Sequence, residues 1–384
     1  MASKQIKILS IGFLLMFFGF NGVQQYVTTF FSEAGIAEIG FRSLVLVYLF
    51  FILFNPFSVW FISKFGSKKC MLFSSVMYSV FILSLLTKSS LVIYASSILL
   101  GISASLLWMG SNSYLIRASN ENDYGKNSGI FNSFQSFGSA AGVIILGFLV
   151  SSFSFDIPFL FFSLFPIIGT LFILTLEDIK GGDNKNQFKL IKKSVASKTV
   201  WRISSIWLVA NLSYGFVIGI IPIQIKELLG ASFVGPLSFL FYALPILLSY
   251  SLGKLSDVKG RKIMVVFSYS LMIFGLFFLT IKMLFVLGIL LLAFNSAIMR
   301  PTTYALIGDV TTKENLEPVS ALFWIVQNIA VVITLFVSSI FQENINSLYY
   351  ISILTIFISI IILMPLSKLR LEEIKNKIGQ EVSS

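Results

Sequence analysis

Apolar runs separated by short polar segments fill almost the whole chain. Each run covers close to the roughly 20 residues that an α-helix needs to cross the hydrocarbon core of a bilayer. Twelve such runs occur, at residues 8–31, 41–61, 69–87, 91–116, 127–152, 157–176, 200–224, 235–252, 263–281, 283–308, 320–341 and 347–366. Pro236 and Pro245 interrupt the short run at 235–252, so the pattern defines the ends of that helix less well. The pattern predicts an all-α integral membrane protein with twelve transmembrane helices.

The composition agrees with this prediction and excludes several classes of function. With 56% hydrophobic and 12% charged residues, the chain has too little polar surface for a soluble domain. Cys70 is the only cysteine, which excludes an intramolecular disulfide and a cysteine metal cluster. The chain has no histidine, the commonest general base and metal ligand, and no carboxylate pair falls within a run. We therefore expect no enzyme activity and no cofactor or metal.

The positive charges predict the orientation in the membrane. If the N-terminus is cytoplasmic, 23 of the 28 Lys and Arg residues fall on the cytoplasmic side, 4 fall outside, and Arg300 lies within a run. An excess of Lys and Arg marks the cytoplasmic side. We expect a multi-pass protein of the cell membrane with both termini in the cytoplasm, acting as a monomer in the lipid bilayer. The net charge of +11 is spread over many loops, so we expect no nucleic-acid partner.

A weak internal repeat divides the chain into two parts. The longest polar stretch, Glu177–Thr199, separates six runs from six. Residues recur across it at an offset near 190: Asn21 and Asn211, Tyr114 and Tyr304, Phe131 and Phe323, Gln135 and Gln327. We predict two pseudo-symmetric six-helix halves at 1–176 and 200–366, a cytoplasmic linker at 177–199 and a cytoplasmic tail at 367–384. Repeats of this kind place a substrate site near the midplane, between the halves.

A short basic loop between two runs reads Gly-Lys-Leu-Ser-Asp-Val-Lys-Gly-Arg-Lys over residues 253–262. It resembles the signature loop of the major facilitator superfamily, written G-x-x-x-D-x-x-G-R-K. The resemblance implies a gate in which Asp257 and Arg261 lock the cytoplasmic side, while Gly253 and Gly260 permit close helix contact and a tight turn. The first-half copy has Ser63 and Ser67 at the acidic and basic positions, so the latch is expected in the second half. The alternative is an ordinary positively charged loop with incidental glycines.

Three segments resemble a narrower branch of that superfamily, named after the animal uncoordinated-93 proteins. They are residues 20–25 (FNGVQQ), 107–115 (LWMGSNSYL) and 125–131 (GKNSGIF). Some animal members of this branch are accessory or trafficking proteins rather than demonstrated transporters. The resemblance therefore implies either function.

Arg300 lies deep within the run at 283–308, where a charge is costly and usually faces a cavity or a partner. Pro301 follows it and can open the helix locally. Two interpretations stay open. Arg300 binds an anion or takes part in gating, or it has a structural role, satisfied by carbonyl groups or Asn295 or extended toward the cytoplasm.

Amide and aromatic side chains recur at helical spacing within several runs. They predict a central cavity lined by both halves, with candidate residues Asn21, Gln25, Trp108, Asn112, Gln135, Asn211, Tyr214, Asn295, Arg300 and Gln327. For each residue alone, the alternative is a hydrogen bond between helices. No run carries an Asp or Glu near its centre, so proton coupling has no evident residue.

We expect a secondary transporter that moves a small polar or anionic organic solute by alternating access, as a uniporter or an exchanger. The alternative is a membrane accessory or trafficking protein that binds a partner protein.

Overall fold

The computed structural model describes residues 4–118, 124–178, 187–312, 315–340, 344–366 and 370–383. Within these ranges the chain forms α-helices and short 3-10 helices, with no strand. The α-helices are α1 (Lys4–Glu33), α2 (Ala37–Phe65), α3 (Ser67–Leu86), α4 (Ser90–Ala118), α5 (Tyr124–Phe153), α6 (Asp156–Phe162), α7 (Leu164–Leu174), α8 (Gln187–Ala196), α9 (Lys198–Ile218), α10 (Ile220–Leu229), α11 (Val234–Lys259), α12 (Arg261–Leu279), α13 (Phe285–Val310), α14 (Leu316–Ile340), α15 (Ile345–Leu363) and α16 (Leu371–Ser383).

Ten helical stretches in the described part of the chain are long and apolar enough to cross a membrane. The pair α9 and α10, bent by 43°, makes an eleventh if it counts as one span. The predicted run at 200–224 is therefore broken. Pro222 has no backbone N–H, and its ring conflicts with the carbonyl of Ile218, so the helix breaks between Ile218 and Ile220. The predicted run at 235–252 lies in α11, whose apolar part, Val234–Leu248, is shorter than the rest.

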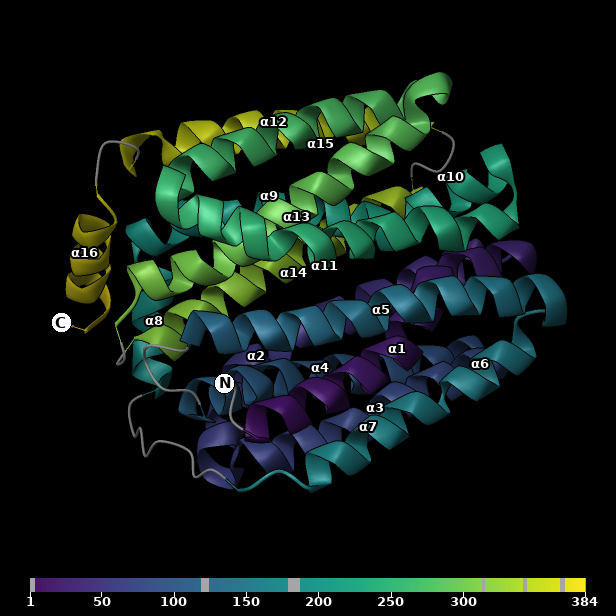
Figure 1. Ribbon diagram of the computed structural model, residues 1–384, viewed down its shortest axis with the longest axis horizontal. Helices are drawn as coiled ribbons and strands as arrows, with labels where there is room; N and C mark the ends of the chain where they lie inside the picture. The colour runs from purple at the N-terminus through teal and green to yellow at the C-terminus, as the bar shows by residue number, and fades with distance from the viewer. Residues whose placement is uncertain are drawn as a thin grey trace.

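The helices pack into two groups, separated in Figure 1 by a diagonal boundary. In the first group, α1 packs mainly against α5 and α7, and α4 packs against α2 and α3. In the second group, α13 packs against α11 and α12, and α14 packs against α9. The pairs α2–α14 and α5–α11 make most of the contact between the groups. Both chain termini lie toward the left of Figure 1, which we call the termini end, and α10 lies at the opposite end.

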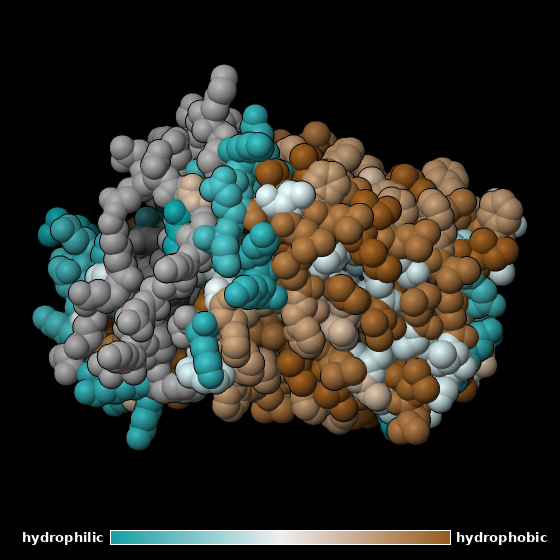
Figure 2. All heavy atoms as spheres, turned by 90° about the horizontal axis from the view of Figure 1, so that it is seen from below, coloured by the Kyte–Doolittle hydropathy of each residue, from teal (hydrophilic) through white to brown (hydrophobic). Residues whose placement is uncertain are grey.

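The molecule exposes a broad apolar surface. Figure 2 shows a broad hydrophobic belt with hydrophilic residues toward its two margins. Large side chains such as Leu91, Phe148, Leu247 and Phe274 are exposed on the molecule. Water would not solvate so large an apolar surface, whereas lipid tails do. The protein is therefore a multi-pass membrane protein.

The predicted linker and tail each contain a helix. The linker helix α8 contacts α14 and α2, and the tail helix α16 packs on α13, α8 and α9. One face of α16 is buried through Ile374, Ile378 and Val382. Polar interactions join the tail to the start of α9. The Glu381 carboxylate accepts hydrogen bonds from the Ser197 hydroxyl and from the Thr199 amide and hydroxyl. Burial raises the pKa of Glu381, but these hydrogen bonds outweigh it and hold the pKa below its ordinary value.

Candidate functional site

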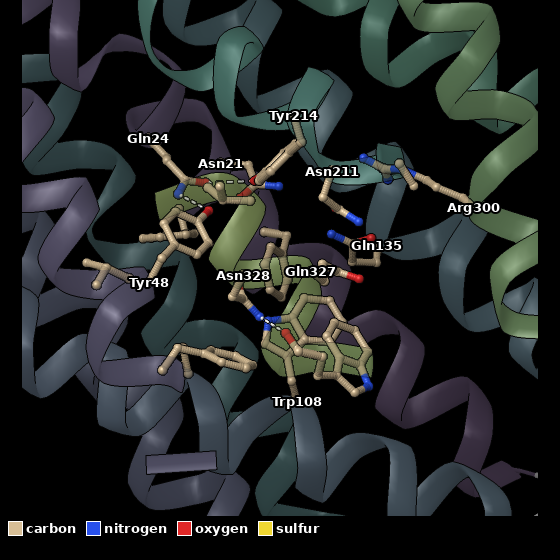
Figure 3. Close-up of a pocket in the computed structure, with 18 of the residues that line it drawn as sticks. Asn21, Gln24, Tyr48, Trp108, Gln135, Asn211, Tyr214, Arg300, Gln327 and Asn328 are labelled. Atoms are coloured by element: carbon tan, nitrogen blue, oxygen red, sulfur yellow. Dashed lines mark hydrogen bonds between the residues drawn. The ribbon is translucent and has the colours of Figure 1, made fainter. Parts of the chain in front are cut away.

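A cavity of about 170 Å³ lies near the middle of the helices, with both groups contributing to its wall. It is larger than the cavity of roughly 150 Å³ that accommodates a benzene molecule. Figure 3 shows its polar side chains converging from several helices. The lining residues are Phe17, Phe20, Asn21, Gln24, Val47, Tyr48, Phe51, Tyr78, Leu100, Ala104, Trp108, Asn132, Gln135, Ala210, Asn211, Tyr214, Phe241, Ser296, Met299, Arg300, Thr303, Trp324, Gln327, Asn328 and Val331.

Seven of the ten residues predicted from the sequence line this cavity. They are Asn21, Trp108, Gln135, Asn211, Tyr214, Arg300 and Gln327. Two pairs of the internal repeat meet here, since Asn21 and Asn211, like Gln135 and Gln327, come from opposite groups. The repeat therefore places equivalent amides on both sides of one space.

Three of the predicted residues do not line it. Gln25 is fully buried between the groups, where its amide donates to the Val217 carbonyl at 2.6 Å and accepts from the Tyr242 hydroxyl at 3.3 Å. Asn295 joins α13 to α12 by donating to the Ser268 carbonyl at 3.0 Å and to its hydroxyl at 2.8 Å. Both are therefore polar links between helices. Asn112 lies one helical turn beyond Trp108 toward the termini end and is not in the cavity wall.

Several amides of the wall are held in one orientation by neighbouring groups. The side-chain nitrogen of Asn211 donates to the Trp207 carbonyl at 3.0 Å, and that of Asn328 donates to the Trp324 carbonyl at 2.7 Å. The nitrogen of Asn21 donates to the Ser139 hydroxyl at 2.8 Å. In each case one N–H of the amide is bonded within the protein, and no described donor reaches the oxygen.

Gln24 forms a polar bridge between the groups. Its nitrogen donates to the Tyr48 hydroxyl at 2.9 Å, and its oxygen accepts from the Tyr214 hydroxyl at 3.2 Å. Figure 3 shows these two bonds side by side. The sequence prediction chose Gln25 in place of Gln24. The spacing of Phe17, Asn21 and Gln24, at i, i+4 and i+7, marks the face of α1 that reaches the cavity. That spacing could have identified Gln24.

Arg300 supplies the only charged side chain among the described lining residues. In the described part of the chain, no carboxylate lies within 4 Å of its guanidinium group. Its one recorded hydrogen bond, to the Ser136 hydroxyl, is long at 3.5 Å. A guanidinium group in this setting retains most of its donor capacity for a ligand. Of the two interpretations left open by the sequence, the geometry favours the one in which Arg300 faces a cavity.

Aromatic rings close the cavity wall toward the termini end. The indole rings of Trp108 and Trp324 stack at a centroid distance of 5.8 Å and an angle of 29°, joining α4 to α14. Phe51 approaches Trp324 at 6.5 Å. This contact between the groups depends on side chains, because α4 and α14 share few backbone contacts.

The opposite end is closed by tighter contacts. The Thr28 hydroxyl donates to the Gly219 carbonyl at 2.9 Å, and Lys226 pairs with Glu33 at 3.6 Å. Gly147 of α5 and Gly235 of α11 bring two backbones together, since a Cβ atom on Gly235 would lie 3.3 Å from the Gly147 Cα. Backbone approach of this kind is typical where glycine faces glycine between membrane helices.

The predicted gate loop forms the turn between α11 and α12. Gly260 has a φ of +90°, and Gly66, between α2 and α3, has a φ of +86°, so both parts of the chain use the same glycine turn. Arg261 donates to the Asp309 carboxylate and to the Ser256 hydroxyl, each at 2.8 Å. A Cβ atom on Gly253 would lie 3.4 Å from Pro301, an ordinary packing distance. The Asp257 side chain lies outside the described residues, so its predicted role stays a prediction.

The sequence prediction missed much of the wall. Asn132 lies three residues before Gln135, and Asn328 lies four residues after Trp324, so a search at i, i+3 and i, i+4 could have included both. Phe20, Tyr48 and Phe241 carry no such signal, because aromatic residues occur throughout the apolar runs.

Comparison with known proteins places this chain among relatives with unc-93 names. It is 30% identical to UNC93-like protein MFSD11 of Xenopus tropicalis over 144 residues, which is 37% of this chain and 32% of that protein. It is 26% identical to UNC93-like protein 3 of Arabidopsis thaliana over 199 residues, or 48% of this chain and 42% of that protein. It is 30% identical to Protein unc-93 homolog A of Bos taurus over 112 residues, covering 29% and 24%. The chain thus spans less than half the length of each of these relatives.

The family profile covers far more of the sequence. The profile described as the Major Facilitator Superfamily matches twice, at residues 9–224 and 203–383. Together the two matches include all but the first eight residues and the last, and they overlap at residues 203–224, within α9 and α10. The chain belongs to the major facilitator superfamily, with an unc-93-like relationship inside it.

Proposed function

We propose that this protein is a secondary transporter that moves a small polar or anionic organic solute across the cell membrane by alternating access. One observation carries the proposal: a cavity near the middle of the helices is lined from both groups, and its single charged residue, Arg300, has no carboxylate partner among the described residues. Binding sites of secondary transporters lie at such positions, near the bilayer midplane and between repeats.

We infer twelve spans in two pseudo-symmetric six-helix halves. Eleven spans would leave the termini on opposite sides, yet both termini lie toward one end of the molecule (Figure 1). Counting α11 as a span makes the number even. Its apolar part is short, and the helix continues to Lys259, which is ample length for a crossing. The proposed bounds are 1–176 and 200–366 for the halves, 177–199 for the linker and 367–384 for the tail.

The excess of Lys and Arg supports a cytoplasmic termini end. The end closed by Thr28, Gly219 and the Lys226–Glu33 pair is then extracellular. Opening it requires that Gln25 separate from Val217 and that α5 separate from α11 at Gly147 and Gly235. On the cytoplasmic side, Arg261 and Asp309 brace α12 against α13, and we propose Asp257 as the residue that latches the gate.

The proposed mode is uniport or solute exchange. No Asp or Glu lines the cavity in the described part of the chain, so a proton has no carboxylate there to bind. We further propose that the protein acts as a monomer in the bilayer and uses no nucleic-acid partner.

The test is solute exchange in proteoliposomes. Purified protein is reconstituted, the lumen is loaded with one member of a panel of organic anions and neutral polar solutes, and uptake of labelled solute is measured. We expect uptake that accelerates when the same solute is present in the lumen. If uptake into vesicles with protein equals uptake into protein-free vesicles for every solute of the panel, the proposal is overturned.

A second candidate is an accessory protein that binds a partner protein, which the similarity to unc-93-like relatives supports. A stable partner recovered from solubilised membranes, together with no uptake of any solute, would favour this candidate.

A further inference from the structure

Hydrogen bonds within the protein fix the orientation of several amide side chains in the cavity wall. Asn211 and Asn328 each donate through nitrogen to a backbone carbonyl, at 3.0 Å and 2.7 Å. A carbonyl can only accept a hydrogen bond, so neither amide can be turned round without losing that bond. The side-chain oxygens of these two residues therefore stay available as acceptors.

The orientation of the Asn21 amide is fixed in the same way, through the Ser139 hydroxyl. The Ser139 hydroxyl donates its proton to the Gln135 backbone carbonyl at 2.9 Å. Its oxygen can then only accept from a neighbour, and it accepts from the Asn21 nitrogen at 2.8 Å. The Gln135 side-chain nitrogen also points to this hydroxyl, at 3.4 Å. Asn21 and Gln135 thus add two more acceptor oxygens to the wall.

The positive charge of the described wall is confined to one residue. Arg300 is the only cation among the described residues of the wall, and it carries a planar array of five N–H donors suited to a carboxylate. A second negative charge on the solute would find no second cation on the described wall. The site therefore matches a single anionic group, with hydrogen-bond donors on the rest of the molecule.

Hydroxyl groups are better suited than an ammonium group to be the hydrogen-bond donors of the solute. A solute ammonium would share the cavity with Arg300 and would find no carboxylate on the described wall. A buried charge without a partner is costly, whereas a hydroxyl needs only a neutral acceptor. The aromatic rings of Trp108 and Trp324 offer a flat apolar surface for the carbon skeleton.

Building on the transport function proposed above, we propose that the solute is a monocarboxylate with several hydroxyl groups, of the size of a six-carbon sugar acid. Arg300 binds its carboxylate. The side-chain oxygens of Asn21, Gln135, Asn211 and Asn328 accept hydrogen bonds from its hydroxyl groups.

The experiment compares three solutes of similar size in the reconstituted protein. Glucuronate carries the carboxylate and the hydroxyl groups, glucose lacks the charge, and cyclohexanecarboxylate lacks the hydroxyl groups. Half-saturating concentrations are measured by exchange in proteoliposomes and by thermal shift of the purified protein. We expect glucuronate to bind at least about tenfold more tightly than either of the others, because each leaves a buried polar group unmatched.

Variants then test which residues bind the carboxylate of the solute and which bind its hydroxyl groups. Arg300→Gln should reduce the affinity for glucuronate toward that for glucose. Asn211→Leu and Asn328→Leu should each reduce the preference for glucuronate over cyclohexanecarboxylate. Asn112→Leu is the matched control, since Asn112 lies within the membrane but outside the cavity wall, and it should leave all three affinities unchanged.

The outcomes separate this proposal from the transport function. Equal affinity for cyclohexanecarboxylate and glucuronate, or a clear preference for amino acids over glucuronate, would overturn the hydroxyl assignment while transport stands. Equal affinity for glucose and glucuronate would overturn the role of the charge. No exchange of any solute in a broad panel would overturn the transport function itself. The wild-type comparison gives a result even if a variant fails to fold.

Discussion

Removing the charge of Arg300 separates a binding role from a structural one. A structural arginine would have a buried partner, and breaking a buried ion pair costs about 3–5 kcal/mol. Arg300 has only a 3.5 Å contact to Ser136 and no carboxylate within 4 Å among the described residues. Arg300→Gln should therefore unfold at nearly the wild-type temperature in detergent.

The effect on binding should be large. A hydrogen bond to a charged group contributes about 1.5–3 kcal/mol, and 1.4 kcal/mol corresponds to a factor of ten. Arg300→Gln should therefore weaken solute binding by roughly 10- to 150-fold. Arg300→Lys keeps the charge but loses the bidentate geometry. Its affinity for the solute should therefore lie between that of Arg300→Gln and that of the wild type.

The assay is exchange in proteoliposomes at several solute concentrations, with the thermal unfolding of each variant measured in parallel. Arg42→Gln is a suitable control, because Arg42 lies outside the cavity and pairs with Glu38 on the surface, where such pairs contribute little. Uptake within about twofold of wild type in a well-folded Arg300→Gln protein would refute the binding role. A loss of folding would instead support the structural interpretation.

Three other predictions concern the ends of the molecule. In Gly235→Leu the new side chain meets Gly147 and the Tyr26 hydroxyl, so α5 and α11 should separate and the population open at that end should grow. Spin-label distances between these helices, in a Cys70→Ser background, should lengthen, and an unchanged distribution would refute the contact. Arg261→Gln leaves the half-buried Asp309 carboxylate without its 2.8 Å partner, which should cost about 1–3 kcal/mol and lower the unfolding temperature. Adding Asp309→Asn should recover part of that loss, and strict additivity would argue against the pair. Glu381 has a lowered pKa in the folded protein, so its contribution to docking α16 is complete above the carboxyl's ordinary pKa and is lost as pH falls through the lowered value. At pH 7, Glu381→Gln should loosen α16, seen as greater mobility of a spin label on its exposed face, and equal mobility would contradict the clamp.

The sequence predicted the helices well because the bilayer imposes a simple rule on each one. A run of about 20 apolar residues is recognisable without knowledge of its neighbours. Two local features were not predicted from the runs. Pro222 bends the span formed by α9 and α10 by 43°, and the polar linker contains α8, whose apolar face is too short to read as a membrane segment.

The cavity was less predictable, because a polar residue within a run has two possible uses. Gln25 and Asn295 have the residue type and spacing of cavity residues, yet each forms hydrogen bonds to another helix. Gln24, the neighbour of Gln25, faces the cavity. Successive residues of a helix point about 100° apart. An error of one residue in assigning the cavity face therefore confuses a cavity residue with one that bonds to another helix.

At the gate, Arg261 pairs with Asp309, 48 residues away on another helix. The signature loop contains no sign of this pair, and the role of Asp257 stays a prediction.

From its sequence alone this protein is a helical membrane protein with a repeated pattern and one intramembrane cation, because hydropathy, charge bias and residue spacing are properties of single segments. Only the tertiary structure decided which amides face the cavity, which of their atoms remain free to bind, and that Arg300 has no described carboxylate beside it. Those outcomes depend on how helices distant in the sequence pack together, and no single segment contains that information.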